Sequence, residues 1–409
     1  MLRRISVTEL RVGMYVVDTG LSWIEHPNLY SVEGEIFSEA ERVAICQEGY
    51  KDVFVETCHG RYKFSDVDVA YRKEFEKEIS AIATTEDIRI TSVDDEMEQA
   101  LRIHGDAMAY AHRLHHCVRS RNCIDLEGAK RLVRDLVLSV MRNRDALLTL
   151  VNVLSEERYT YSHCINVAVL ATSFGNFLDL PSSMLEELGT AALFHDIGKI
   201  VVPRSILNKP GKLTEAEFEI IKRHPRESFH MLNRRPGISS NVANGVLQHH
   251  EKYNGSGYPN RLSGESISLI GRIISIADVY DALTSERVYK RSILPHKALS
   301  IIYSMRETDY HPGMAERFIK CVGIYPPGSM VLVSNGHIGF VCASRSDSPL
   351  TPMVKVVFDA HMLPLESYTV DLAEAKELSI VSCLDPADYN LDPRMYLVEL
   401  EDVLQNYAV

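Results

Sequence analysis

Histidine and aspartate side chains occupy apolar helix faces in the middle of this 409-residue chain, and this feature restricts its possible folds more than any other. His163 shares a helix face with Val167, Leu170 and Phe174, at offsets of four, seven and eleven residues. The other segments with this pattern contain His195 and Asp196, His224, His249 and His250, and Asp278 and Asp281. One such histidine is readily satisfied by a carbonyl. Five histidines and three aspartates in one core would carry a large desolvation cost unless they were paired or bound to metal. The pattern therefore predicts a helical bundle around a metal site.

The adjacent pair His249 and His250 needs a special geometry, because neighbouring residues usually point to different faces of a helix. Both rings reach one ion only if the end of the helix faces it. Imidazole nitrogen with carboxylate oxygen suits Fe, Mn, Zn or Ni, and the absence of thiolates argues against a structural zinc site. The segment "AYAHRLHHCVRS" (109–120) also spaces His112 and His116 four residues apart. It contains arginines but no acid, so we interpret it as a solvated helix face, with metal binding as the alternative.

Composition excludes several classes of protein. The net charge of −12 argues against broad nucleic-acid binding, but not against a small anionic ligand, because a bound metal can dominate the local field. No window approaches the ~18 consecutive apolar residues of a membrane helix, and the N-terminus lacks a signal-peptide pattern. The eight cysteines are scattered, without a C-x-x-C pair. We expect reduced thiols, a cytoplasmic location, and no DNA or membrane partner.

The pattern of apolar residues changes along the chain and predicts a mainly α protein. Short apolar runs over residues 1–75 indicate a small β-containing N-terminal module. Residues 76–127 are predicted to be a linker and helical connector, with an acid-rich linker stretch at 84–99. Residues 128–322 have helical spacing and form the predicted metal-binding domain. Residues 323–409 are expected to form a small β-rich C-terminal module, with a hairpin at Asn335-Gly336.

Three motifs in the helical region resemble HD-GYP domains of the HD phosphohydrolase superfamily. They are "ALFHDIGKIVVPRSILNKPGKLT" (192–214), "HHEKYNGSGYP" (249–259) and "IADVYDALTSERVYK" (276–290), and the resemblance covers roughly 150–320. The stretch "ISVTELRVGMYVVDTGLSW" also resembles a domain of unassigned role that often precedes HD-GYP domains. The resemblance implies an all-α HD-type bundle with phosphodiesterase activity on cyclic dinucleotides, typically cyclic di-GMP.

By the same resemblance, Asp196 bridges two divalent metal ions. The remaining ligands of one ion are His163, His195 and Asp278, and those of the other are His224, His249 and His250. Lys199 matches a lysine that contacts the scissile phosphate, and Asp196 and Lys199 are the predicted catalytic residues. The residues predicted to contact substrate are Arg287, Lys290, Tyr258 and Asp281. Tyr159 stands where some family members use Glu for a third metal, so we expect two ions: Fe or Mn first, with Ni, Zn, Mg or Ca as alternatives.

The predicted function is hydrolysis of cyclic di-GMP to linear pGpG, to GMP, or to both. One alternative is a non-catalytic receptor or interaction module for cyclic dinucleotides, and another is a phosphodiesterase that prefers cyclic GMP-AMP. A general nucleotidase is disfavoured by the glycine-rich motif "NGSGYP" (254–259). That loop is also expected to shape the substrate pocket or to offer a surface to a signalling partner, and the oligomeric state is left open.

Overall fold

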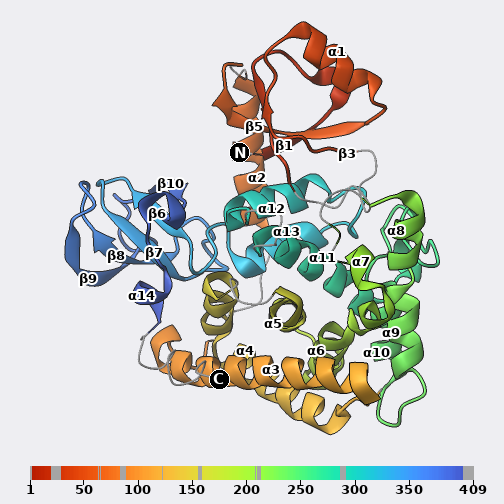
Figure 1. The fold of residues 1–409 in the computed structure, drawn as a ribbon. Coiled ribbons are helices and arrows are strands. Elements are labelled where there is room, and N and C mark those ends of the chain that lie inside the picture. The colour runs from red at the N-terminus through yellow and green to blue at the C-terminus, as the bar shows by residue number, and fades with distance from the viewer. Residues whose placement is uncertain are drawn as a thin grey trace.

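In the computed structural model, a helical bundle has an N-terminal β-containing part above it and a C-terminal sheet at its side (Figure 1). The structure describes residues 2–19, 29–62, 64, 66–82, 89–121, 123–154, 159–207, 209, 213–285 and 292–398. Within these residues the fold is the predicted one: mainly α, with a small sheet at each end of the chain.

The N-terminal sheet is built around the long strand β5 (Asp52–Gly60). Its other members are β1 (Leu2–Ser6), β2 (Met14–Val16), β3 (Leu29–Tyr30) and β4 (Gly34–Glu35). β1 and β2 pair antiparallel with β5 on its two sides, and helix α1 (Glu39–Gln47) precedes β5. Val53 and Val55 of β5 pack into a small core of this sheet, whereas Phe54 faces the core of the bundle. Successive side chains of β5 point to opposite faces of the sheet, so this strand contributes to both cores.

The bundle consists of long helices that bring distant parts of the chain together. Its members are α2 (Asp66–Ala81), α3 (Val93–Arg121), α4 (Leu126–Val153), α5 (Tyr159–Phe177), α6 (Ser182–Phe194), α9 (His224–Leu232), α10 (Ser240–Gln248), α11 (Leu269–Thr284), α12 (Pro295–Ser304) and α13 (Met314–Val322). The short helices α7 (Arg204–Leu207) and α8 (Glu215–Ile221) and the 3-10 turn η2 (Ile197–Val201) lie between α6 and α9. α5 packs against α4, α6 and α11, and α3 packs against α4, α5 and η2 (Figure 1).

The acid-rich stretch 84–99 was predicted to be a linker, and that prediction is wrong from Val93 onward, where α3 begins. Acids favour the first turn of a helix because its free N–H groups carry partial positive charge. Glu96 is also buried, and its carboxylate accepts hydrogen bonds from Ser139 and from the Arg142 guanidinium. Charge in this stretch therefore marks a helix start and an ion pair between α3 and α4.

The C-terminal sheet has the order β10-β6-β7-β8-β9 and is antiparallel throughout. Its strands are β6 (Met330–Val333), β7 (Ile338–Ala343), β8 (Met353–Phe358), β9 (Pro364–Asp371) and β10 (Ile380–Leu384). The hairpin predicted at Asn335-Gly336 is confirmed between β6 and β7, and Gly336 has the left-handed φ of +87° that such turns favour. Among the described residues, no helix combines the length and apolar character that crossing a membrane requires.

Candidate metal centre

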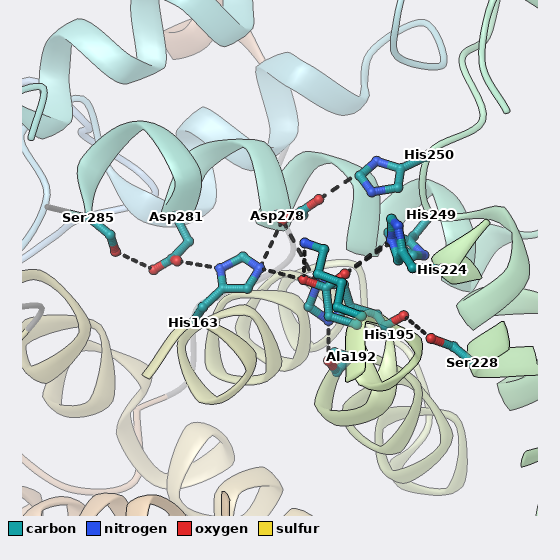
Figure 2. A network of polar contacts seen from close by, with 12 residues as sticks. His163, Ala192, His195, His224, Ser228, His249, His250, Asp278, Asp281 and Ser285 are labelled. Carbon is teal, nitrogen blue, oxygen red and sulfur yellow. Dashed lines mark hydrogen bonds and ion pairs between the residues drawn. The ribbon is translucent and has the colours of Figure 1, made fainter. Parts of the chain in front are cut away.

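All seven side chains predicted as metal ligands converge at one point of the bundle (Figure 2). Five elements position them. His163 lies on α5, His195 and Asp196 follow the end of α6, His224 opens α9, His249 and His250 follow the end of α10, and Asp278 lies on α11. All are buried except His250, whose side chain is 10% exposed. The end of α10 faces the other ligands, which is the arrangement that the adjacent histidines require.

Three of the rings are fixed by main-chain carbonyl groups three residues earlier in the chain. The pairs are His195 Nδ1 with Ala192 O at 2.7 Å, His224 Nδ1 with Ile221 O at 2.9 Å, and His249 Nδ1 with Val246 O at 2.7 Å. A carbonyl oxygen only accepts, so each Nδ1 must carry the proton and donate it. Each Nε2 is then left with a free lone pair directed into the cluster, which is the tautomer that a metal ligand needs.

His163 is fixed by a side chain instead. Its Nδ1 lies 2.7 Å from Asp281 Oδ2, while Asp281 Oδ1 accepts from Asn166 and Ser285. Asp281 is fully buried behind His163, and both its oxygens are occupied (Figure 2). We had predicted that Asp281 lines the substrate site. In the structure it lies on the far side of His163 from the other ligands, where it orients the ring.

The donor atoms divide into two groups. One contains His163, His195 and Asp278, the other Asp196, His224, His249 and His250, and the atoms of each group lie within 4.8 Å of one another. Asp196 faces both groups. Its Oδ2 lies 3.4 Å from the Nε2 atoms of His163 and His195, and its Oδ1 lies 3.1 Å from His224 Nε2. One carboxylate is thus placed between two sets of imidazoles.

The protonation states of the cluster suit metal binding. Burial by itself raises the pKa of the Asp196 carboxyl, but the Lys199 ammonium and His195 outweigh it and hold that pKa well below its usual range. Burial is likewise outweighed at Asp278, mainly by His163, and the pKa of that carboxyl is also low. Burial lowers the pKa of His224, and it lowers those of His249 and His250 well below their usual range. Ionised carboxylates and neutral imidazoles are the forms that bind metal ions.

Two buried polar atoms of the cluster lack a hydrogen-bond partner among the described residues: His195 Nε2 and Asp196 Oδ1. Leaving such atoms unsatisfied is costly, and buried polar groups nearly always have a partner. Both atoms point into the space between the ligands. The residues present therefore fit divalent metal ions bound through nitrogen and oxygen, with no thiolate among the donors.

Lys199 follows Asp196 in the 3-10 turn η2, and its ammonium contacts Asp196 Oδ2. Gly198 lies in η2, and its φ is not positive. Close packing is the reason for glycine here. Any Cβ at Gly198 would collide with the main chain at His224 and Ser228, so glycine lets α9 approach η2 closely.

The glycine-rich loop packs against the second group of ligands. The Tyr258 ring stacks on His250 with centroids 4.7 Å apart, and a Cβ at Gly257 would collide with the main chain at Lys252. The buried carboxylate of Glu251 accepts hydrogen bonds from the main-chain N–H groups of Asn260 and Leu262. Tyr258 therefore lies beside the ligands, which is compatible with its predicted contact with substrate.

Some sequence predictions receive no structural test. Arg287 and Lys290 lie outside the described residues. His112 and His116 are exposed on α3, as expected for a solvated face. Neither belongs to a cluster of potential metal ligands among the described residues.

A cavity of about 420 Å³ opens beside the cluster, and we call it the metal-centre cavity. His163, Asp196 and Lys199 lie on its wall, and α3 contributes Leu114, Val118 and neighbouring residues. The sequence interpretation missed α3 as part of the site. The signal was present, because Ala111, Leu114, His115, Val118 and Arg119 form one stripe at helical spacing.

Three known sequence families match the chain. Residues 139–313 match the HD domain, residues 2–129 match a domain of unknown function (DUF3391), and residues 330–392 match a KOW domain associated with the HD domain. Together the three matches extend over most of the sequence.

Curated relatives are similar over different lengths. A cyclic di-GMP phosphodiesterase of Pseudomonas aeruginosa is 35% identical over 391 residues, which is 95% of this chain and 93% of the relative. The cyclic di-GMP phosphodiesterase response regulator RpfG of Xanthomonas campestris is 42% identical over 147 residues, 35% of this chain and 38% of the relative. The 3'3'-cGAMP-specific phosphodiesterase 2 of Vibrio cholerae is 35% identical over 167 residues, 41% of this chain and 32% of the relative. The first of these similarities extends over nearly the whole of both proteins.

Proposed function

Because the chain belongs to the HD-GYP family of HD-domain proteins, we propose that it hydrolyses cyclic di-GMP with the help of two bound divalent metal ions. The observation that carries this proposal is the position of Asp196, whose two oxygens face two separate groups of buried imidazoles. The Pseudomonas relative, named a cyclic di-GMP phosphodiesterase, supports the substrate.

The ligand assignment follows from the two groups of donors. His163, His195 and Asp278 would hold one ion, His224, His249 and His250 the other, and Asp196 would be shared. Two ions bound there would lower the pKa of a shared water and neutralise charge that develops on the phosphate. Fe or Mn suits the mixture of imidazole nitrogen and carboxylate oxygen best, with Ni, Zn, Mg or Ca as alternatives.

In the reaction, water hydrolyses a phosphodiester bond. The oxygen of the water bonds to phosphorus, the bond between phosphorus and the 3' oxygen breaks, and the 3' oxygen takes up a proton. Lys199 lines the metal-centre cavity and is held there by Asp196, so its ammonium can stabilise charge on the non-bridging oxygens. Arg287 and Lys290 would bind the phosphates. Both lie outside the described residues, so this role rests on the sequence motif alone. Cleavage of one ester bond gives pGpG, and cleavage of both gives GMP.

A phosphodiesterase for cyclic GMP-AMP is the second candidate, because the Vibrio relative is named for that substrate. A receptor without catalysis is a weaker candidate, since such a protein has no need to keep all seven donors and Lys199. A cytoplasmic location and a signalling partner at the loop 254–259 are further parts of the proposal and rest on the sequence.

Product analysis tests the proposed function. Protein loaded with Fe(II) or Mn(II) is incubated with cyclic di-GMP, 3'3'-cyclic GMP-AMP or cyclic di-AMP, and the products are separated by chromatography. We expect cyclic di-GMP to be consumed fastest, with pGpG or GMP as products. Faster cleavage of cyclic GMP-AMP would favour the second candidate. Binding without cleavage by fully loaded protein would overturn the proposed activity.

A further inference from the structure

The metal-centre cavity has two walls that come from different parts of the chain. α3 forms one wall, and η2 with α7 forms the other, while His163 and Asp196 of the metal cluster lie at its inner end. At about 420 Å³ the cavity falls within the ~300–1,000 Å³ typical of pockets for small molecules. The cavity is therefore large enough for a small-molecule ligand next to the metal cluster.

The walls are largely apolar. Leu114 and Val118 of α3 line one side, and Ile197, Ile200 and Leu207 line the other. A purine base is flat and has two apolar faces, so it loses unfavourable water contacts when it is placed between such side chains. The shape and polarity of the walls therefore suit a nucleobase.

The charged residues of the cavity favour an anion. Three cationic side chains, Arg119, Lys199 and Arg204, line it, whereas Asp196 is its one carboxylate among the described residues. Asp196 is already in contact with Lys199, but neither arginine forms an ion pair within the described residues. A chain with a net charge of −12 thus has a cationic surface here. Arginine can bind a phosphate through two parallel hydrogen bonds.

A cyclic dinucleotide has two phosphates and two bases, and the metal cluster can act on only one phosphate at a time. We infer that the metal-centre cavity binds the nucleotide that is not being cleaved, with its base against Leu114 and Val118 and its phosphate on Arg119. This inference rests on the proposed function. It gives α3 a part in substrate selection, although α3 lies in residues 2–129, which match a domain of unknown function.

The chain offers a matched pair of variants. Arg119 lines the cavity, whereas Arg113 is also exposed on α3 but does not line it. The two positions are six residues apart, so they lie on helix faces separated by ~120°. We expect Arg119→Ala to raise KM for cyclic di-GMP by ~10-fold with little change in kcat, because a contact far from the reacting bond stabilises ground and transition states alike. Arg113→Ala should resemble wild type.

Two further measurements separate this inference from the proposed function. With bis(p-nitrophenyl) phosphate, a small diester that needs only the metal cluster, Arg119→Ala should be as active as wild type. Titration of metal-free protein with a fluorescent cyclic di-GMP reports binding without catalysis. Weaker binding by Arg119→Ala than by Arg113→Ala supports the inference, whether or not wild type cleaves a cyclic dinucleotide. If wild type cleaves none, the proposed function is overturned, but the inference about binding is not. Equal binding and equal KM for the two variants would overturn the inference and leave the proposed function standing.

Discussion

Two cavities lined by described residues have walls of opposite charge, and the metal-centre cavity is the smaller of the two. The larger, of about 850 Å³, lies where the N-terminal sheet, α12 and the C-terminal sheet meet, and we call it the intermodule cavity. Among the described residues, Lys297 is its one lysine, and its acidic lining residues are Asp18, Glu33, Glu56, Glu76, Asp385 and Asp388. Glu56 is 7% exposed and pairs with Lys297 at 2.8 Å, which links strand β5 to α12.

The difference shows that neither size nor overall charge locates the chemistry. The intermodule cavity is acidic, like the chain as a whole. Two of its charged residues, Glu56 and Lys297, form an ion pair that joins two parts of the fold. The metal-centre cavity departs from the average charge of the chain, and two buried polar atoms of the adjoining cluster, His195 Nε2 and Asp196 Oδ1, lack a hydrogen-bond partner among the described residues. Changes there should alter catalysis and binding, whereas changes in the intermodule cavity should alter stability.

The largest effect is expected from Asp196→Ala. Because this carboxylate faces both groups of donors, its loss should remove both ions and reduce turnover of cyclic di-GMP below detection. Elemental analysis of wild type should give two metal ions per chain, and the variant should give close to none. Circular dichroism serves as the folding control. A variant that kept full metal content and turnover would show that the ligand assignment is wrong, and a stable ratio near three in wild type would contradict a binuclear centre.

Lys199→Ala should keep its metal ions but lose kcat by ~10²–10³, the scale of removing one donor that stabilises a transition state. Lys222→Ala is the matched control, because Lys222 also pairs with an acid three residues earlier, Glu219, outside the cavity. Initial rates with saturating cyclic di-GMP measure the effect. If both variants kept the kcat of wild type, Lys199 would have only a structural role in η2.

Asp281→Asn should weaken metal binding by ~10–100-fold, since the residues behind metal ligands set ring orientation and basicity. Asparagine replaces one acceptor oxygen with an amide nitrogen, which places donors opposite Asn166 or Ser285. Ser285→Ala, which removes a single donor to Asp281, should have a smaller effect. Competition with a chelator measures affinity. Unchanged affinity together with a higher KM would restore the sequence prediction that Asp281 contacts substrate.

The smallest catalytic effect is expected in the intermodule cavity. Lys297→Ala leaves the buried Glu56 carboxylate without its cation, which should lower the free energy of unfolding by about 1–3 kcal/mol. Both kcat and KM should stay at wild-type values. Thermal denaturation and steady-state kinetics measure the two quantities, and a double variant with Glu56→Gln should recover part of the stability. A marked change in kcat or KM would show that the two cavities communicate.

The sequence predicted a buried cluster of ionisable groups because several of them interrupt apolar stripes, and an ionisable group in a core position needs a partner. The assignment of the full ligand set was implied by the resemblance to HD-GYP domains. His163, His249 and Asp278 follow this rule, and the structure brings them together. The hairpin at Asn335-Gly336 was predictable for an equally local reason, since its turn requires positive φ.

Other features could not be read from the pattern. His195 and His249 are oriented by main-chain carbonyls, which every residue possesses and which leave no trace in the sequence. Asp281 has the same spacing on α11 whether it points at substrate or at His163, so only tertiary packing decides its role. The apolar stripe of α3 looks the same whether it packs on a core or lines a cavity. In each case the sequence does not show which group of another element the side chain contacts in the folded protein.

The origin of the α3 wall also determines which fragments of this protein can work. A chain that began at residue 128 would retain every predicted metal ligand and Lys199, yet one side of the metal-centre cavity would be open to water. Such a fragment should still cleave small diesters while losing its preference among cyclic dinucleotides. Exchanging the first 127 residues with those of a relative should then shift selectivity without altering a single metal ligand, which would show that substrate choice depends in part on a stretch of the chain that contributes nothing to bond cleavage.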